Sequence, residues 1–83
     1  MHRPTRRLDT CGTFCPVPIL LTECEMAKLT AGERLEVVGD DPGIREDMPA
    51  WCHSTGHHLE SMEETDDGRI VCLLRKVHGL PSS

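Results

Sequence analysis

Two prolines set one residue apart restrict where the first helix of this chain can begin. Pro16 and Pro18 directly follow a cysteine in the segment Cys15-Pro16-Val17-Pro18. Proline is tolerated in the first turn of a helix, because the backbone N–H groups there have no partner within the helix. The pattern therefore predicts a helix that starts at this segment, with Cys15 in extended geometry at or next to the N-cap.

The residues after the prolines repeat at helical spacing. One face is formed by Val17, Leu20, Leu21, Cys24, Ala27 and Lys28. This spacing indicates the buried face of a helix that ends near Leu29, since Ala31-Gly32 follows. We expect the Leu20/Cys24 stripe to pack in the core, with Cys24 as an ordinary buried thiol.

Turn residues divide the rest of the chain into shorter elements. Four strands and a second helix are predicted, and they span residues 6–10, 33–39, 43–54 (the helix), 57–64 and 69–77. The last two strands flank the hairpin signal Asp67-Gly68. The order β-α-β-α-β-β predicts an α+β fold, a two-layer α/β sandwich with two helices on one face of a four-stranded mixed sheet.

The length of 83 residues gives room for one domain with one modest core. Phe14 and Trp51 are the only aromatic residues, so aliphatic and sulfur-containing side chains have to build that core. We expect residues 1–83 to form a single domain whose ordered part spans about residues 6–77. The N-terminal arm and the C-terminal tail are expected to be flexible.

An excess of acidic residues argues against direct nucleic-acid binding. The chain has 14 acidic and 9 basic side chains and a formal charge of −5, whereas affinity for nucleic acid comes from positive charge. No apolar run approaches the ~20 residues that span a bilayer, and the N-terminus lacks the apolar stretch of a signal peptide. We therefore expect a cytoplasmic monomer that binds neither membranes nor nucleic acid.

The five cysteines fit neither a disulfide scaffold nor a structural zinc site. They are Cys11, Cys15, Cys24, Cys52 and Cys72, an odd number at irregular spacing. The sequence predicts no metal and no organic cofactor. The pair Asp40-Asp41 is interpreted as a turn and N-cap before Pro42 rather than as an acid–base pair.

Cys15 is the candidate reactive residue. A sulfur at a helix start would lie near free N–H groups and the positive end of the helix dipole. That position is expected to lower the pKa of the thiol and to stabilise a thiolate or a persulfide anion. Gly12, Pro16 and Pro18 would shape the site. The local pattern alone leaves open that Cys15 merely starts the helix.

Several segments together resemble the TusA/SirA-type sulfur-carrier family. They are Leu8-Asp9, Gly12, Cys15-Pro16-Val17-Pro18, Gly32-Glu33, Leu35-Glu36-Val37, Asp40-Asp41-Pro42, Asp47-Met48-Pro49-Ala50-Trp51-Cys52 and Thr55-Gly56-His57. They occur in the family's order and spacing, and the resemblance runs from about Leu8 to Lys76. It implies the same β-α-β-α-β-β sandwich and makes Cys15 the sulfur-bearing residue.

The resemblance also implies a function. Cys15 would accept sulfane sulfur as a persulfide and relay it to a partner protein, which would make the chain a sulfurtransferase. The donor would be a cysteine desulfurase or a rhodanese-like protein, and the acceptor would serve tRNA thiolation, cofactor sulfuration or sulfur oxidation. Two alternatives stay open: a thiol redox switch with Cys11 as the second thiol, and a non-catalytic protein-interaction module.

Overall fold

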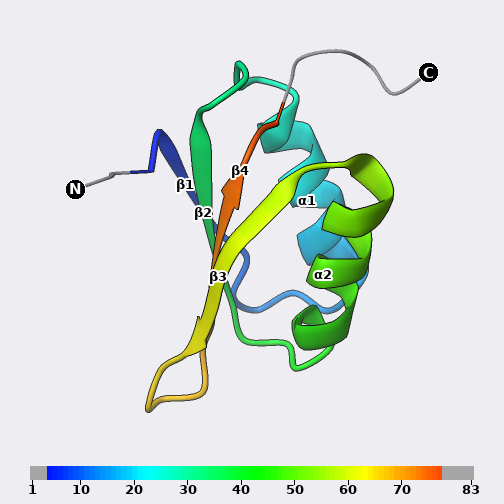
Figure 1. Cartoon of the computed structure of the whole chain (residues 1–83). Helices are drawn as coiled ribbons and strands as arrows, with labels where there is room; N and C mark the ends of the chain where they lie inside the picture. The colour runs from blue at the N-terminus through cyan, green and yellow to red at the C-terminus, as the bar shows by residue number, and fades with distance from the viewer. Residues whose placement is uncertain (1–3, 78–83) are drawn as a thin grey trace.

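The computed structural model describes residues 4–77 as four strands and two helices. The elements are β1 (Arg6–Asp9), α1 (Val17–Met26), β2 (Arg34–Gly39), α2 (Ile44–Thr55), β3 (His58–Glu64) and β4 (Ile70–Arg75). Both helices lie on one face of the sheet (Figure 1). This arrangement confirms the predicted α+β sandwich and the predicted order of its elements. The flexible ends expected from the sequence fall largely outside the described residues.

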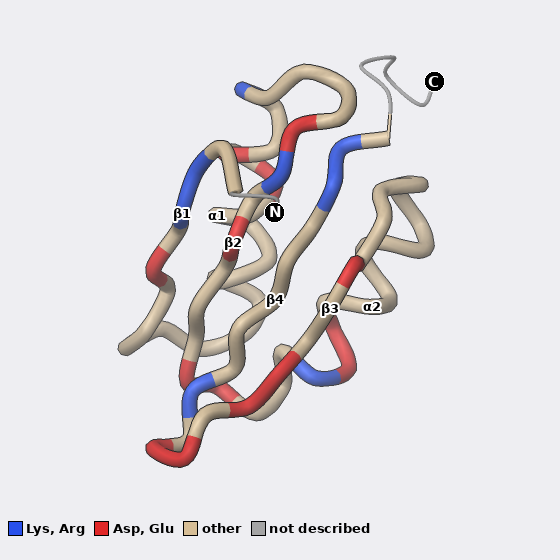
Figure 2. The backbone as a smooth tube through the Cα atoms, turned by 60° about the vertical axis from the view of Figure 1, so that its left-hand side comes forward, with Lys and Arg blue, Asp and Glu red and all other residues tan. Residues whose placement is uncertain are grey.

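The four strands form one mixed sheet in the order β1-β2-β4-β3. Figure 2 shows them side by side in this order. β1 pairs with β2 in parallel, which requires the crossover through α1, and the other pairs are antiparallel. Neither helix within residues 4–77 is long and apolar enough to cross a membrane.

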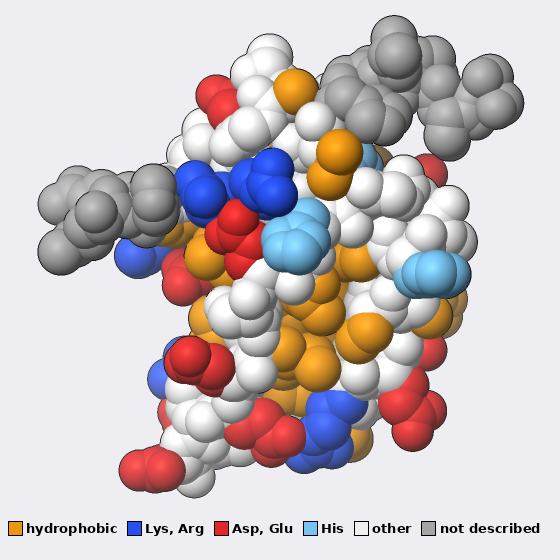
Figure 3. Space-filling model, viewed as in Figure 1, with side chains coloured by type: hydrophobic (Ala, Val, Ile, Leu, Met, Phe, Trp, Pro, Cys, Tyr) orange, Lys and Arg blue, Asp and Glu red, His pale blue; other side chains and the backbone are white. Residues whose placement is uncertain are grey.

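The core lies between the helices and the two central strands. β2 and β4 alternate between buried and half-buried residues, as expected for a sheet with one covered face. α2 adds a buried stripe at every fourth position, formed by Ile44, Met48 and Cys52. Hydrophobic side chains also reach the surface between β3 and α2 (Figure 3).

α1 turns a different face to the core than the sequence predicted. Its buried residues are Pro18, Thr22 and Met26, whereas Leu20 is 53% exposed and Cys24 is also exposed. The predicted face did not include Thr22. Its hydroxyl donates to the Pro18 carbonyl at 2.7 Å within the same helix, so the side chain can be buried without losing a hydrogen bond. The more apolar stripe of α1 therefore faces solvent.

β3 contains a bulge that the sequence did not predict. The register against β4 shifts between Leu59 and Ser61, which leaves Glu60 as the extra residue. The Glu60 carboxylate accepts hydrogen bonds from Arg34 at 2.7 Å and from Arg75 at 2.9 Å. One side chain of β3 is thereby joined to both central strands.

Lys76 closes the C-terminal end of α1. Its Nζ donates to the carbonyl oxygen of Met26 at 2.8 Å and to that of Leu29 at 2.7 Å. Carbonyl groups at a helix end have no partner within the helix, and a cation suits the negative end of the helix dipole. A residue after the last strand thus satisfies the end of the first helix.

Replacing Lys76 by methionine is expected to lower the free energy of unfolding by about 1–3 kcal/mol, because two half-buried carbonyl groups lose a charged donor. Urea denaturation measures the change. Lys28→Met is the control, since Lys28 forms only an exposed pair with Glu25 and is expected to contribute less than about 0.5 kcal/mol. Equal losses in the two variants would contradict the role of Lys76.

Candidate functional site

Cys15 lies where the two helices begin near one another. It precedes Pro16, the N-cap of α1, and the peptide bond between them is cis. Gly43, the N-cap of α2, approaches so closely that a Cβ placed on it would stand 3.3 Å from Cys15 Sγ. In Figure 1 both helices run upward from these starts. The sulfur therefore packs against the start of α2, a neighbour that the sequence did not predict.

The loop between β2 and α2 holds the loop that carries Cys15. Asp41 Oδ2 accepts the backbone N–H of Cys15 at 2.9 Å, and Asp40 Oδ1 accepts that of Gly12 at 3.1 Å. The sequence predicted an N-cap role for this pair. That prediction was wrong, because Gly43 is the N-cap and no side chain caps the helix. The two aspartates instead join the loops.

The remaining residues that were expected to shape the site lie on both sides of Cys15. Gly12 has a φ of +87°, a left-handed conformation that favours glycine, and its N–H points to Asp40. Pro16 is exposed at the N-cap, whereas Pro18 is buried in the first turn of α1. The prolines thus begin the helix where the sequence predicted, and one of them also packs in the core.

The charges next to Cys15 are negative, contrary to the prediction. Burial raises the pKa of the Cys15 thiol to about 12, and the carboxylates of Asp41 and Asp47 add to the rise. The expected lowering of this pKa is therefore wrong. Burial and two carboxylates outweigh the positive end of a helix dipole, and Cys15 rests as a protonated thiol at neutral pH.

Known proteins share this sequence pattern over nearly the whole chain. Residues 6–76 match the family model described as Sulfurtransferase TusA. The chain belongs to the TusA family. YrkI of Bacillus subtilis (strain 168) is 44% identical to it over 64 residues, which make up 77% of this chain and 83% of YrkI. The sulfur carrier protein TusA of Pseudomonas syringae pv. syringae is 36% identical over 69 residues, 83% of this chain and 81% of that protein.

A solved structure supports the fold of this TusA family member. The SirA-like protein of Desulfitobacterium hafniense superposes with a TM-score of 0.79 and covers 89% of this chain and 100% of its own. The two sequences are 23% identical, so the similarity concerns the fold alone. Together the comparisons confirm the family resemblance and the role of a sulfur carrier.

Cys11 is the second thiol that the sequence singled out. It is half-buried, and its backbone N–H donates to Asp9 Oδ1 at 2.9 Å. Burial and Asp9 raise the pKa of its thiol. Cys11 and Cys15 are both free thiols in the structure. Their use as a redox pair stays a prediction.

An exposed apolar surface along α1 adjoins Cys15. We name it the α1 patch, and it consists of Phe14, Val17, Leu20 and Leu21, which are 75%, 40%, 53% and 37% exposed. The helical spacing predicted that the helical members of this patch would lie in the core. Large exposed apolar side chains that cluster in this way commonly mark an interaction surface. The patch places such a surface beside Cys15.

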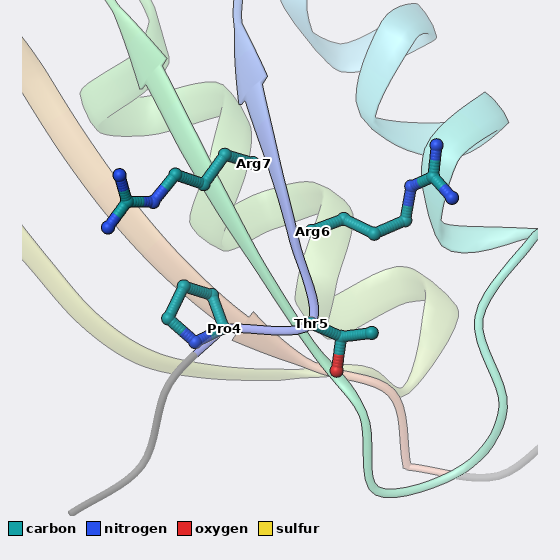
Figure 4. Close-up of a pocket in the computed structure, with 4 residues that line it drawn as sticks. All are labelled: Pro4, Thr5, Arg6 and Arg7. Carbon is teal, nitrogen blue, oxygen red and sulfur yellow. The ribbon is translucent and has the colours of Figure 1, made fainter.

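Pro4, Thr5, Arg6 and Arg7 line a surface hollow at the beginning of β1. Figure 4 shows that the side chains of Arg6 and Arg7 point to opposite sides of the strand. Arg6 pairs with Glu25 and Arg7 pairs with Glu36, each at 2.9 Å. The two guanidinium groups therefore do not converge on a ligand, and this hollow supports no anion site.

Two rings pack together at the end of α2. The centroids of Trp51 and His57 are 5.5 Å apart, and the neighbouring His53 and His58 are exposed. Among residues 4–77, no three His, Cys, Asp or Glu side chains are grouped as a metal ion would require.

Alkylation of Cys15 by iodoacetamide is expected to be slow at neutral pH and to accelerate with rising pH. Because the thiolate is the nucleophile, a pKa of about 12 leaves the rate still increasing at about pH 10. A free cysteine, with a pKa near 8.5, levels off by then. The rate is measured in a variant with Cys11→Ser and Cys24→Ser, which removes the other accessible thiols. A plateau below about pH 9 would contradict the raised pKa.

Proposed function

We propose that this chain carries sulfane sulfur as a persulfide on Cys15 and relays it to a partner protein. The observation that supports this best is the place of Cys15 Sγ. It is half-buried against the start of α2 and lies beside the exposed α1 patch. Sulfur at this position is sheltered by the protein, yet it stays within reach of a protein that covers the patch.

Uptake and delivery are two thiol–persulfide exchanges. In uptake, Cys15 Sγ attacks the outer sulfur of a donor persulfide, a new S–S bond forms on Cys15, and the donor leaves as a thiol. In delivery, an acceptor thiol attacks the outer sulfur on Cys15, and the Cys15 thiol is restored. The sulfane sulfur keeps its oxidation state throughout. The exchanges therefore need no electron carrier, metal or organic cofactor.

The surroundings of Cys15 suit a carrier that spends time empty. Oxidants attack the thiolate rather than the thiol, so susceptibility follows thiolate character and exposure. The raised pKa and the partial burial of Cys15 reduce both. The empty carrier is thus expected to resist oxidation until a sulfur donor reaches it.

The α1 patch is the proposed docking surface for donor and acceptor proteins. Both kinds of partner have to bring a sulfur atom to Cys15, and the patch begins with Phe14 and Val17 on either side of Cys15-Pro16. Apolar anchors near the centre of an interface commonly carry most of its binding energy. One surface would therefore serve both partners in turn.

Incubation with a cysteine desulfurase and cysteine is expected to add one sulfur atom, about 32 Da, that a reductant removes. Intact-mass spectrometry should show this adduct on the wild type and not on Cys15→Ala. Cys24→Ala is the matched control, because it removes an exposed thiol of α1 and should load normally. An equal adduct on Cys15→Ala would refute the assignment of Cys15.

The two alternative functions give different results in the same experiment. A redox switch would form a reversible disulfide between Cys11 and Cys15 when a mild oxidant such as hydrogen peroxide is added, and it would not respond to sulfur donors. An interaction module would show neither the disulfide nor the adduct.

Leu20→Glu is expected to slow loading from the desulfurase about tenfold, because a charge at the centre of the α1 patch opposes docking. Loading from a small persulfide such as glutathione persulfide should be unchanged, since this donor needs no docking surface. Val77→Glu is the control, because Val77 is exposed to 39% but lies at the end of β4, outside the patch. Equal slowing with both donors would contradict a docking role.

A further inference from the structure

Gly43, the N-cap of α2, is a glycine that its backbone conformation does not require. Its φ is −61° and its ψ is −20°, a right-handed helical conformation that any residue adopts. Glycine loses more conformational entropy on folding than other residues, and serine is preferred to it at an N-cap. The space around Gly43, and not its conformation, therefore explains why a side chain is absent here.

Two groups of the sulfur site occupy that space. A Cβ on Gly43 would stand 3.1 Å from Asp41 Oδ2, 3.3 Å from Cys15 Sγ and 3.6 Å from Cys15 Cβ. The first two separations are tighter than ordinary van der Waals contact. The same Asp41 oxygen accepts the backbone N–H of Cys15 at 2.9 Å. A side chain at Gly43 would therefore press on the sulfur and on the carboxylate that holds its loop.

The start of α2 is the less movable partner in this contact. The Gly43 carbonyl accepts the N–H groups of Glu46 at 3.2 Å and of Asp47 at 2.9 Å. Ile44, the next residue, is completely buried in the core. Cys15 is only half-buried, and its Sγ can move by rotation about a single bond. A side chain at Gly43 would therefore turn the sulfur away from α2 and toward solvent.

We propose that Gly43 is a positioning residue. The space that it leaves lets Cys15 Sγ lie against the start of α2, and this contact directs attack on the loaded persulfide to its outer sulfur. The inference rests on the proposed function and adds to it the choice between two sulfur atoms. A persulfide on Cys15 offers both of its sulfurs to a nucleophile, and only one of them leads to transfer.

The two possible attacks give different products. When a thiolate R–S⁻ attacks the outer sulfur, R–S–SH forms, the S–S bond on Cys15 breaks, and Cys15 leaves as a thiolate that takes up a proton. When the thiolate attacks Sγ, a mixed disulfide between R and Cys15 forms, and HS⁻ leaves. Both reactions balance without an external oxidant or reductant. The first attack delivers the sulfur, whereas the second loses it as sulfide and leaves Cys15 blocked.

The contact with α2 hinders the second attack. A thiolate displaces a sulfur leaving group in line, from the side opposite to it, so the rate depends on access to that side. Because Gly43 and its helix occupy one side of Sγ, the outer sulfur extends to the opposite, accessible side. The in-line path to Sγ then comes from the side of Gly43, where the backbone blocks it. The in-line path to the outer sulfur comes from solvent and is open.

The test measures how the loaded carrier reacts with glutathione. Gly43→Ala and Gly43→Ser, in a background with Cys11→Ser and Cys24→Ser, are loaded with a cysteine desulfurase and cysteine and then freed of small molecules. Intact-mass spectrometry separates carrier that returns to the free thiol from carrier that holds a glutathione disulfide. The disulfide fraction is expected to be at least about threefold higher in both variants than in the background, because Sγ becomes accessible.

Alkylation of the empty carrier by iodoacetamide is a second readout, and it needs no sulfur donor. Both variants are expected to react at least about threefold faster than the background near pH 8, because the thiolate is the nucleophile and an Sγ nearer to solvent ionises more readily. Their rates should also level off at a lower pH, since burial is the main cause of the raised pKa of Cys15. A loss of stability alone would not move this pH profile.

The two substitutions separate the added Cβ from effects on the helix. Serine is a better N-cap than alanine, so a change caused by capping would differ between the variants, whereas a change caused by the Cβ would appear in both. Glu46→Ala is the matched control, because Glu46 is an exposed residue of the same helix turn and should leave both readouts unchanged.

If either readout stayed at the background value in both Gly43 variants, the inference would be overturned and the proposed function would stand. Failure of the background protein to take up sulfur on Cys15 would overturn both.

Discussion

The hydrogen bond between the Cys15 N–H and the Asp41 carboxylate connects two loops that are 26 residues apart in the chain. Each loop follows a strand of the parallel pair β1–β2, so both leave the sheet at the same edge and each leads into a helix. The parallel pairing therefore brings Cys15 to Gly43. Together with the bond from the Gly12 N–H to Asp40, the bond between Cys15 and Asp41 fixes the position of the loop that carries Cys15.

The surroundings of Cys15 combine two properties that a sulfur carrier needs at different moments. Partial burial and two carboxylates keep the sulfur neutral at rest, while the α1 patch beside it leaves a surface that another protein can cover. A carrier has to be unreactive toward the solvent and accessible to its partners. Here the loop and the start of α2 provide the first property, and the outward face of α1 provides the second.

Most of the fold could be predicted from local patterns, because the buried positions of β2 and β4 alternate and prolines mark the start of α1. The buried face of α1 could not. Periodicity shows that a helix has an apolar side, but it does not show which side faces the sheet. In α1 the Thr22 hydroxyl donates to a carbonyl of the same helix, so this polar side chain can be buried. The negative charge of Asp41 and Asp47 near Cys15 could not be predicted for a related reason. Both residues are distant from Cys15 in the sequence, and only the fold makes them act on its thiol.

The bulge at Glu60 bears on how this chain meets other copies of itself. β3 is an edge strand of the sheet, and an open strand edge is a template on which another chain can add its own strand. The bulge interrupts that edge, and the strand carries the charged side chains of Glu60, Glu63 and Glu64. Self-association through this edge of the sheet is thereby discouraged, on the strand farthest from β1.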